Sequence, residues 1–152
     1  GFGSICEHAA TETITSIVDA NDDRFLAPQN MTAEVQAACR ESGQKVPEGI
    51  YQVAAVIYNS LAKCYADTVR EIEKIEHVTY PCINIVGGGA NAAYLNELTA
   101  KATGKTVYAG PTEATAIGNI MAQMIAAGEL QDLAEARKCV FHSFEIKEEK
   151  GC

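Results

Sequence analysis

The chain has 152 residues, close to the commonest size of a single domain. Its formal net charge of −8 and the absence of a basic patch argue against a nucleic-acid partner, because nucleic acids attract basic surfaces. Hydrophobic residues make up 47% of the chain, enough for a core, but no apolar run approaches the length of a membrane-spanning helix. We therefore expect a domain with neither a nucleic-acid nor a membrane partner.

Six cysteines are scattered along the chain without a CxxC pair, so neither a zinc site nor a thioredoxin-type motif is indicated. Cys39, Cys64 and Cys82 occupy apolar positions and are expected to be small core residues. Cys6 and His8 lack further ligand partners, so no metal role is assigned to them. Free thiols and the lack of a signal peptide favour a cytoplasmic protein, although the sequence leaves disulfides between distant cysteines open.

Residues 1–30 show the least regular pattern of the chain. Alternation over residues 14–18 indicates a short strand. The run D-A-N-D-D at 19–23 is spaced like the start of a calcium loop, but Arg24 and Asn30 stand where that loop needs a glycine and a bidentate glutamate. We interpret this run as a solvated turn.

Two helices are predicted next. Apolar residues at helical spacing extend from about Met31 to Ser42, a helix that Asn30 can cap and Gly43 can end. A second helical pattern covers residues 48–76, which corresponds to a helix on the order of 40 Å long. Its charged face is expected to be a solvated surface, and its Ser-Cys-Thr seam disfavours a coiled coil.

A β-α-β-α unit is predicted from residue 82 to residue 128. It comprises a strand at Cys82–Val86, a helix that Gly104 stops, a strand at Lys105–Ala109, and a helix that Thr112 can cap. Gly118 within that last helix suggests a close approach to a neighbouring element. A short acidic helix at 132–139 and a charged tail at 147–150 complete the chain. Two parallel strands are too few for a sheet covered on both faces, so the chain looks like part of a larger α/β domain.

Gly87, Gly88 and Gly89 lie at the junction between the first predicted strand and the helix after it. Three glycines leave no Cβ to block a ligand, and a helix N-terminus with free backbone N–H groups favours an anion. A tight turn without a ligand is the alternative. The spacing also satisfies a loose G-x-G-x-x-A dinucleotide fingerprint, but no acidic residue ends the second strand, and there is no GxxxxGK[ST] motif.

The run INIVGGGANAAYLNELTAKATGKTVYAGPTEATAIGNIMAQMIAAGEL resembles the C-terminal region of the FGGY carbohydrate kinases. The resemblance also includes N-D-D-R-F at 21–25, Q-A-A-C-R-E at 36–41, and S-L-A at 60–62 with Y-A-D at 65–67. It covers roughly residues 14–140. It implies an α/β fold, a helix-rich part of an actin-like (ribonuclease H-like) ATPase domain. Residues 1–152 would then be the C-terminal part of the second such domain, with no internal boundary.

The resemblance implies an ATP-dependent sugar kinase that uses Mg²⁺. The members most similar to this chain convert L-rhamnulose and ATP to L-rhamnulose 1-phosphate and ADP. Their catalytic aspartate, their Mg²⁺ ligands and their sugar-binding residues lie upstream of this region, so residues 1–152 alone are expected to be inactive. Asp19, Asp22 and Asp23 are not assigned to those roles. A kinase for another sugar and a stand-alone binding module are the alternatives.

The resemblance also implies the nucleotide contacts. Gly88 is expected to contact the adenosine side of ATP, while Gly87 and Gly89 shape the loop. Related kinases often have asparagine where Ala92 stands, and Asn91 is expected either to replace it or to cap the helix. If upstream strands are missing, an unpaired sheet edge and bare apolar faces are expected, so that the chain would dimerise through that edge or a helix face, or be only marginally stable.

Overall fold

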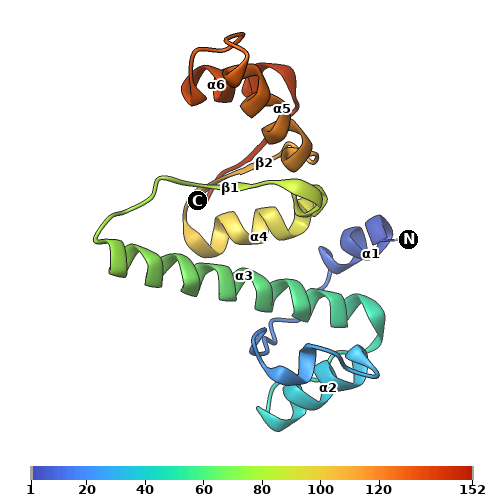
Figure 1. Cartoon of the computed structure of the whole chain (residues 1–152). Coiled ribbons are helices and arrows are strands. Elements are labelled where there is room, and N and C mark those ends of the chain that lie inside the picture. Colours follow the sequence, from blue (N-terminus) through green and yellow to red (C-terminus); the bar gives the residue numbers. More distant parts are fainter. Residues whose placement is uncertain (1, 152) are drawn as a thin grey trace.

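The computed structural model describes residues 2–151 and has eight helical segments and three strands in this part of the chain (Figure 1). In chain order these are α1 (Phe2–Ala9), η1 (Asp23–Phe25), α2 (Met31–Glu41), α3 (Gly49–Glu76), β1 (Cys82–Ile85), η2 (Gly87–Asn91), α4 (Ala93–Thr103), β2 (Thr106–Ala109), α5 (Ala114–Ala126), α6 (Leu133–Ser143) and β3 (Lys147–Glu149). The fold is therefore a helix-rich α/β fold with a small sheet.

Helix α3 is the long element against which most of the other helices pack. Its 28 residues confirm the predicted helix at 48–76, and it ends where His77 adopts a left-handed conformation with φ of 55°. Helices α1, α2 and α4 all contact it. In Figure 1, α4 lies between α3 and the sheet, while α5 and α6 lie together on the opposite side of the sheet.

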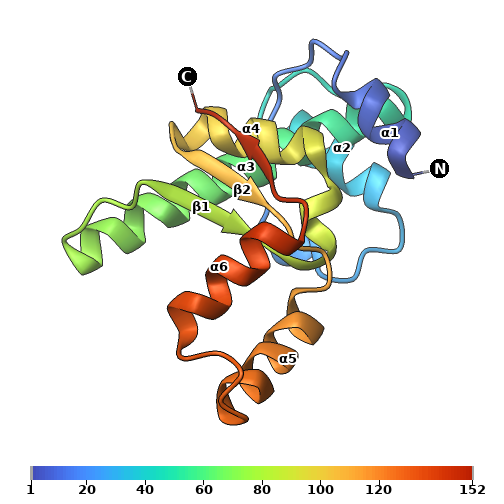
Figure 2. The same ribbon diagram turned by 90° about the horizontal axis from the view of Figure 1, so that it is seen from above.

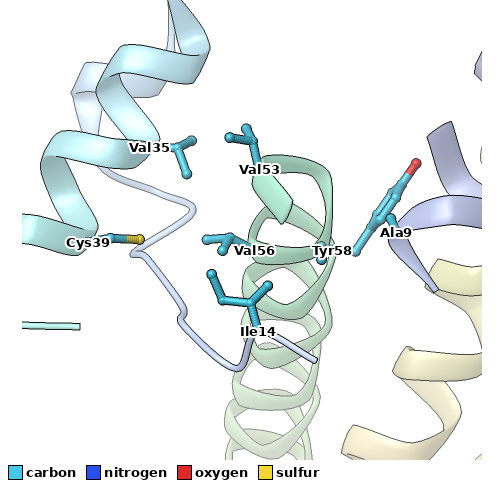
Figure 3. Close-up of a cluster of buried hydrophobic side chains, with 8 residues drawn as sticks. Ala9, Ile14, Val35, Cys39, Val53, Val56 and Tyr58 are labelled. Carbon is cyan, nitrogen blue, oxygen red and sulfur yellow. The ribbon is translucent and has the colours of Figure 1, made fainter. Parts of the chain in front are cut away.

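The main hydrophobic core lies where α2 packs on the first turns of α3. Val35 and Cys39 of α2 face Val53 and Val56 of α3, and Ile14 fills the space between them (Figure 3). The start of α2 was predicted correctly, because the Asn30 side chain accepts a hydrogen bond from the Ala33 backbone N–H. Burial raises the pKa of the Cys39 thiol. The core expectation is therefore confirmed for this cysteine.

The other described cysteines have free thiols and are only partly buried. Cys64 and Cys82 do not belong to the hydrophobic core cluster, so the expectation that they are core residues is wrong, and Cys152 lies outside the described residues. Cys6, on the unexpected helix α1, lies 2.8 Å from the Tyr58 hydroxyl, measured from sulfur to oxygen. Burial and this contact raise the pKa of Tyr58 to about 12.

The predicted strand over residues 14–18 is wrong, because this segment is extended but does not join the sheet. Its backbone hydrogen bonds go to side chains instead. The Ile17 N–H donates to Gln44 Oε1 and the Val18 N–H donates to Ser60 Oγ, both at 2.9 Å. The acidic run at 19–23 is an exposed turn as predicted, with the Asn21 N–H bonded to Asp19 Oδ1.

The sheet has the order β1-β2-β3. Strands β1 and β2 are parallel as predicted, with Cys82 opposite Thr106 and Ile85 opposite Ala109. Strand β3 was not predicted: three residues of the presumed charged tail pair antiparallel with β2, so that Val107 lies opposite Glu149. Within the described chain, β1 therefore has a strand partner on one side only (Figure 2).

Three expectations about the last two helices need correction. Helix α5 begins after Glu113 without a side-chain cap, so Thr112 does not cap it. Gly118 is exposed, and a Cβ there would meet no atom of the described chain within 4 Å, so no close approach explains it. Helix α6 continues to Ser143, well past the predicted end at residue 139, after Asp132 caps it through the Glu135 N–H.

An ion pair joins the end of α3 to the start of β2. Lys105 Nζ donates to Glu73 Oε1 at 2.6 Å and to the Tyr80 carbonyl at 2.7 Å, and the Tyr80 N–H donates to the same Glu73 oxygen. Both side chains are largely covered by the protein. The hydrogen bond from Lys105, followed by the one from Tyr80, holds the pKa of Glu73 below its ordinary value of 4.5.

A lowered pKa means that the Glu73 carboxylate contributes stability above its ordinary pKa and loses this contribution as the pH falls through the folded-state pKa. We therefore expect Glu73→Gln to lower the free energy of unfolding near pH 7, and the difference from wild type to shrink below about pH 4.5. Urea unfolding at several pH values checks this. In a Lys105→Gln background most of the pH-dependent difference should disappear, whereas a constant difference from pH 7 to pH 3 would contradict the role of the ion pair.

Candidate functional site

The three glycines form a short 3₁₀ helix, η2, between β1 and α4. Gly87 adopts a φ of +76°, and its N–H donates to the Pro111 carbonyl at 3.0 Å, which ties this loop to the loop after β2. Gly88 and Gly89 are exposed and have ordinary negative or extended φ values. A Cβ at Gly88 would meet nothing within 4 Å, and a Cβ at Gly89 would lie 3.8 Å from Ile85 Cγ2.

This geometry bears on the two interpretations of the glycine loop. A turn without a ligand requires glycine only at Gly87, where φ is positive. At Gly88 and Gly89 the described chain leaves room for a side chain, so neither the backbone conformation nor internal packing explains these glycines. The backbone at both positions is therefore open to the approach of a ligand.

A cavity of about 280 Å³ lies beside the loop, at the carboxyl ends of β1 and β2. Ligands of open α/β sheets commonly bind at this end of the strands. The cavity is close to the smallest volume usual for small-molecule sites, so it suits part of a nucleotide rather than all of it. Its lining residues are Ala90, Asn91, Ala109, Gly110, Pro111, Thr112, Glu113, Ile117, Phe144, Glu145 and Lys147.

Asn91 is the only one of the four predicted site residues that lines this cavity. Its Oδ1 lies 3.5 Å from Thr112 Oγ1, within reach of a weak hydrogen bond from that hydroxyl. The N-cap of α4 is Ala92, and no side chain caps this helix, so the structure gives no support to the alternative in which Asn91 acts as the cap. The exposed amide of Asn91 is thus free to contact a ligand.

The sequence did not indicate the other walls of the cavity. Residues 110–113 were interpreted as a turn and a cap within the run that carries the family resemblance, and residues 147–150 as a charged tail. Their only signal was the Gly110-Pro111 pair directly after the second strand. Gly110 packs against the later segment so closely that a Cβ on it would lie 2.7 Å from the Glu145 carbonyl oxygen.

The acidic residues of the turn at 19–23 lie away from this cavity. Asp22 is occupied by Arg24, which donates to it from the backbone N–H and from Nε. Asp19 lines a different hollow, formed with α3. Residues 2–151 contain no group of three or more histidine, cysteine, aspartate or glutamate side chains that could hold a metal ion. The polar side chains that line the cavity are the Asn91 amide, the Thr112 hydroxyl, and the charged groups of Glu113, Glu145 and Lys147.

Comparison with known proteins identifies the protein family. The model of the FGGY family of carbohydrate kinases, C-terminal domain, matches residues 6–127, and the chain therefore belongs to this family. Within the family, its curated relatives include rhamnulokinases. The chain is 46% identical over 147 residues to that of Bacillus subtilis and 43% identical over 145 residues to that of Oceanobacillus iheyensis. It is 48% identical over 132 residues to that of Enterococcus faecalis.

The alignments cover 96%, 95% and 84% of this chain, respectively, but only 30%, 31% and 26% of the three relatives. The chain thus spans about a third or less of the length of these kinases. No helix in the described part of the chain combines the length and the apolar character that crossing a membrane would require.

Proposed function

We propose that this chain is the C-terminal part of the second actin-like domain of an ATP-dependent sugar kinase. The reaction is transfer of a phosphoryl group from ATP to L-rhamnulose, which gives L-rhamnulose 1-phosphate and ADP. Membership of the FGGY family and the rhamnulokinase names of the relatives support this proposal. The observation that carries the role of this region is the exposed pair Gly88 and Gly89, whose glycine identity nothing inside the described chain requires.

In this proposal the loop 87–91 binds the adenosine side of the nucleotide. Gly88 lets the ligand approach the backbone, Gly87 fixes the turn, and Gly89 keeps the surface beside Ile85 open. Asn91 supplies an amide at the mouth of the cavity. ATP supplies the phosphoryl group and Mg²⁺ neutralises charge on its phosphates, whereas this region only binds and orients the nucleoside.

Phosphoryl transfer depends on positioning and on electrostatic stabilisation of the transferring group. We place the catalytic base, the Mg²⁺ ligands and the sugar site in the part of the kinase that precedes these residues. Residues 1–152 alone should therefore show no kinase activity. The free thiols of the described cysteines support a cytoplasmic location for the enzyme. A stand-alone binding module is not favoured, because the chain belongs to the FGGY family and the relatives that it matches are named as rhamnulokinases.

A coupled ADP-release assay tests the function. The complete kinase polypeptide that contains this chain should consume ATP fastest with L-rhamnulose among a panel that includes L-fuculose, D-xylulose and glycerol. The 152-residue chain, measured in parallel, should release no ADP above the buffer control. Much faster turnover of another sugar would contradict the proposed substrate but not the family assignment. ATP consumption by the 152-residue chain would contradict the proposal that the catalytic residues lie in the preceding part of the kinase.

We further propose that the 152-residue chain self-associates. Strand β1 is at an edge of the sheet, and an apolar groove of about 730 Å³ over α5 and α6 begins beside it at Val86 and extends to Phe141. Unpaired edges and large exposed apolar surfaces favour contact with another chain. Light scattering should therefore give the mass of a dimer or show marginal stability. A monomer with a high melting temperature would contradict this expectation.

A further inference from the structure

A buried amide supports the glycine loop from the helix behind it. Asn96, in the second turn of α4, is 2% exposed, and its Nδ2 donates to the carbonyl oxygen of Ala90 at 3.0 Å. Ala90 lies in η2 directly before Asn91, whose side chain lines the cavity. The hydrogen bond therefore connects the core of the domain to the loop that faces the ligand.

The loop has few other attachments. At its start the Gly87 N–H donates to Pro111, and at its end the Ala92 N–H donates back to Gly89 at 3.1 Å. No side chain caps the N-terminus of α4 at Ala92. Among the described side chains, Asn96 is the one that bonds the middle of the loop, at Ala90. Gly88 and Gly89 have no side chain that could pack against the domain and hold the loop in place.

The carbonyl oxygen of the Asn96 amide shows that this residue is not explained by packing alone. Asn96 Oδ1 is buried, and no group of the described chain donates a hydrogen bond to it. A buried polar atom without a partner is unfavourable, and leucine has the same branching with no polar atom to bury. Within the described part of the chain, the amide is therefore explained by its donor, which bonds to the loop carbonyl of Ala90.

We propose that Asn96 is a positioning residue, which holds the Ala90 carbonyl and thereby orients Gly88, Gly89 and Asn91 for the nucleoside. This inference rests on the proposed function for its consequence in binding ATP. The hydrogen bond from Asn96 that restrains the loop does not depend on that function. The two parts can therefore be measured separately.

Amide hydrogen exchange on the 152-residue chain tests the hold. Asn96→Leu should speed exchange of the amides at 87–92 by about fivefold or more, with the rest of the chain unchanged. The matched control is Thr99→Val, because Thr99 is equally buried on the same helix and bonds only to Leu95 of that helix. Asn96→Ala removes the amide without adding bulk, should Leu disturb the fold. Equal loop exchange in the Asn96 and Thr99 variants would overturn the proposal.

Steady-state kinetics on the complete kinase test the consequence. Asn96→Leu should raise the KM for ATP by about fivefold or more while kcat and the KM for sugar change less than about twofold, and Thr99→Val should leave all three near wild type. An unchanged KM for ATP in the Asn96 variants would overturn the positioning role even if loop exchange were faster. If the wild-type kinase consumed no ATP, the proposed function would fail, and the exchange experiment would still decide whether Asn96 holds the loop.

Discussion

In the complete kinase, Gly88→Val is expected to raise the KM for ATP on the order of tenfold or more, with kcat nearly unchanged. Tenfold corresponds to about 1.4 kcal/mol of lost nucleotide binding. The reason is steric: the Gly88 backbone is exposed, and a branched side chain there would occupy the space from which the ligand approaches. Binding lost equally from ground state and transition state appears in KM rather than in kcat. Initial rates at varied ATP and saturating sugar measure this.

The fold should tolerate the same change. A Cβ at Gly88 meets no atom of the described chain within 4 Å and its φ is not positive, so the free energy of unfolding should change by less than about 1 kcal/mol. Gly118→Val is the matched control, since Gly118 has equally open surroundings and lies on α5, outside the glycine loop. A sharply lower melting temperature with an unchanged KM for ATP would instead favour a plain turn between strand and helix.

Among the substitutions proposed here, Gly110→Ala is expected to lower the free energy of unfolding most, by about 2–3 kcal/mol. Gly110 has a φ of +127°, which side chains rarely adopt, and a Cβ there would lie 2.7 Å from the Glu145 carbonyl oxygen. The Glu145 oxygen is a backbone atom rather than the end of a flexible side chain, so relief of this contact requires the segment before β3 to move. Urea unfolding of the 152-residue chain measures the loss.

Gly104→Ala separates the cost of a positive φ from the cost of the close contact with Glu145. Gly104 ends α4 with a φ of +66°, but a Cβ there meets nothing within 4 Å, so only the left-handed conformation costs free energy, about 1 kcal/mol. Gly110→Ala should therefore be clearly more destabilising than Gly104→Ala. Equal losses at the two positions would show that the contact between Gly110 and residues 145–146 contributes nothing.

The parts of the fold that sequence predicts are those determined by local physics. Helices α2 and α3 follow from apolar periodicity, and the side chain of Asn30 fixes the start of α2. The parallel pair β1 and β2 follows from two short apolar runs separated by a helix that ends at Gly104. The helix signals lie within the elements that they specify, whereas the parallel pairing of strands 24 residues apart follows from the β-α-β order of the sequence.

The parts that sequence does not predict depend on distant partners. Strand β3 consists of charged residues, and it is a strand because it pairs with β2 about 40 residues earlier. The extended segment at 14–18 has the alternation of a strand, yet Gln44 and Ser60 take its hydrogen bonds. For the same reason the loop 87–91 could be predicted from its glycines, while the opposite wall of the cavity could not.

Amide hydrogen exchange of the complete kinase, with and without MgATP, tests most directly whether this loop binds the nucleotide. We predict slower exchange at residues 87–92 and 110–113 when MgATP is added, and no slowing at 87–92 in the Gly88→Val variant at the same nucleotide concentration. Nucleotide-dependent protection elsewhere in the kinase, with exchange at 87–92 unchanged in the wild type, would contradict the assignment of the glycine loop to the nucleotide site.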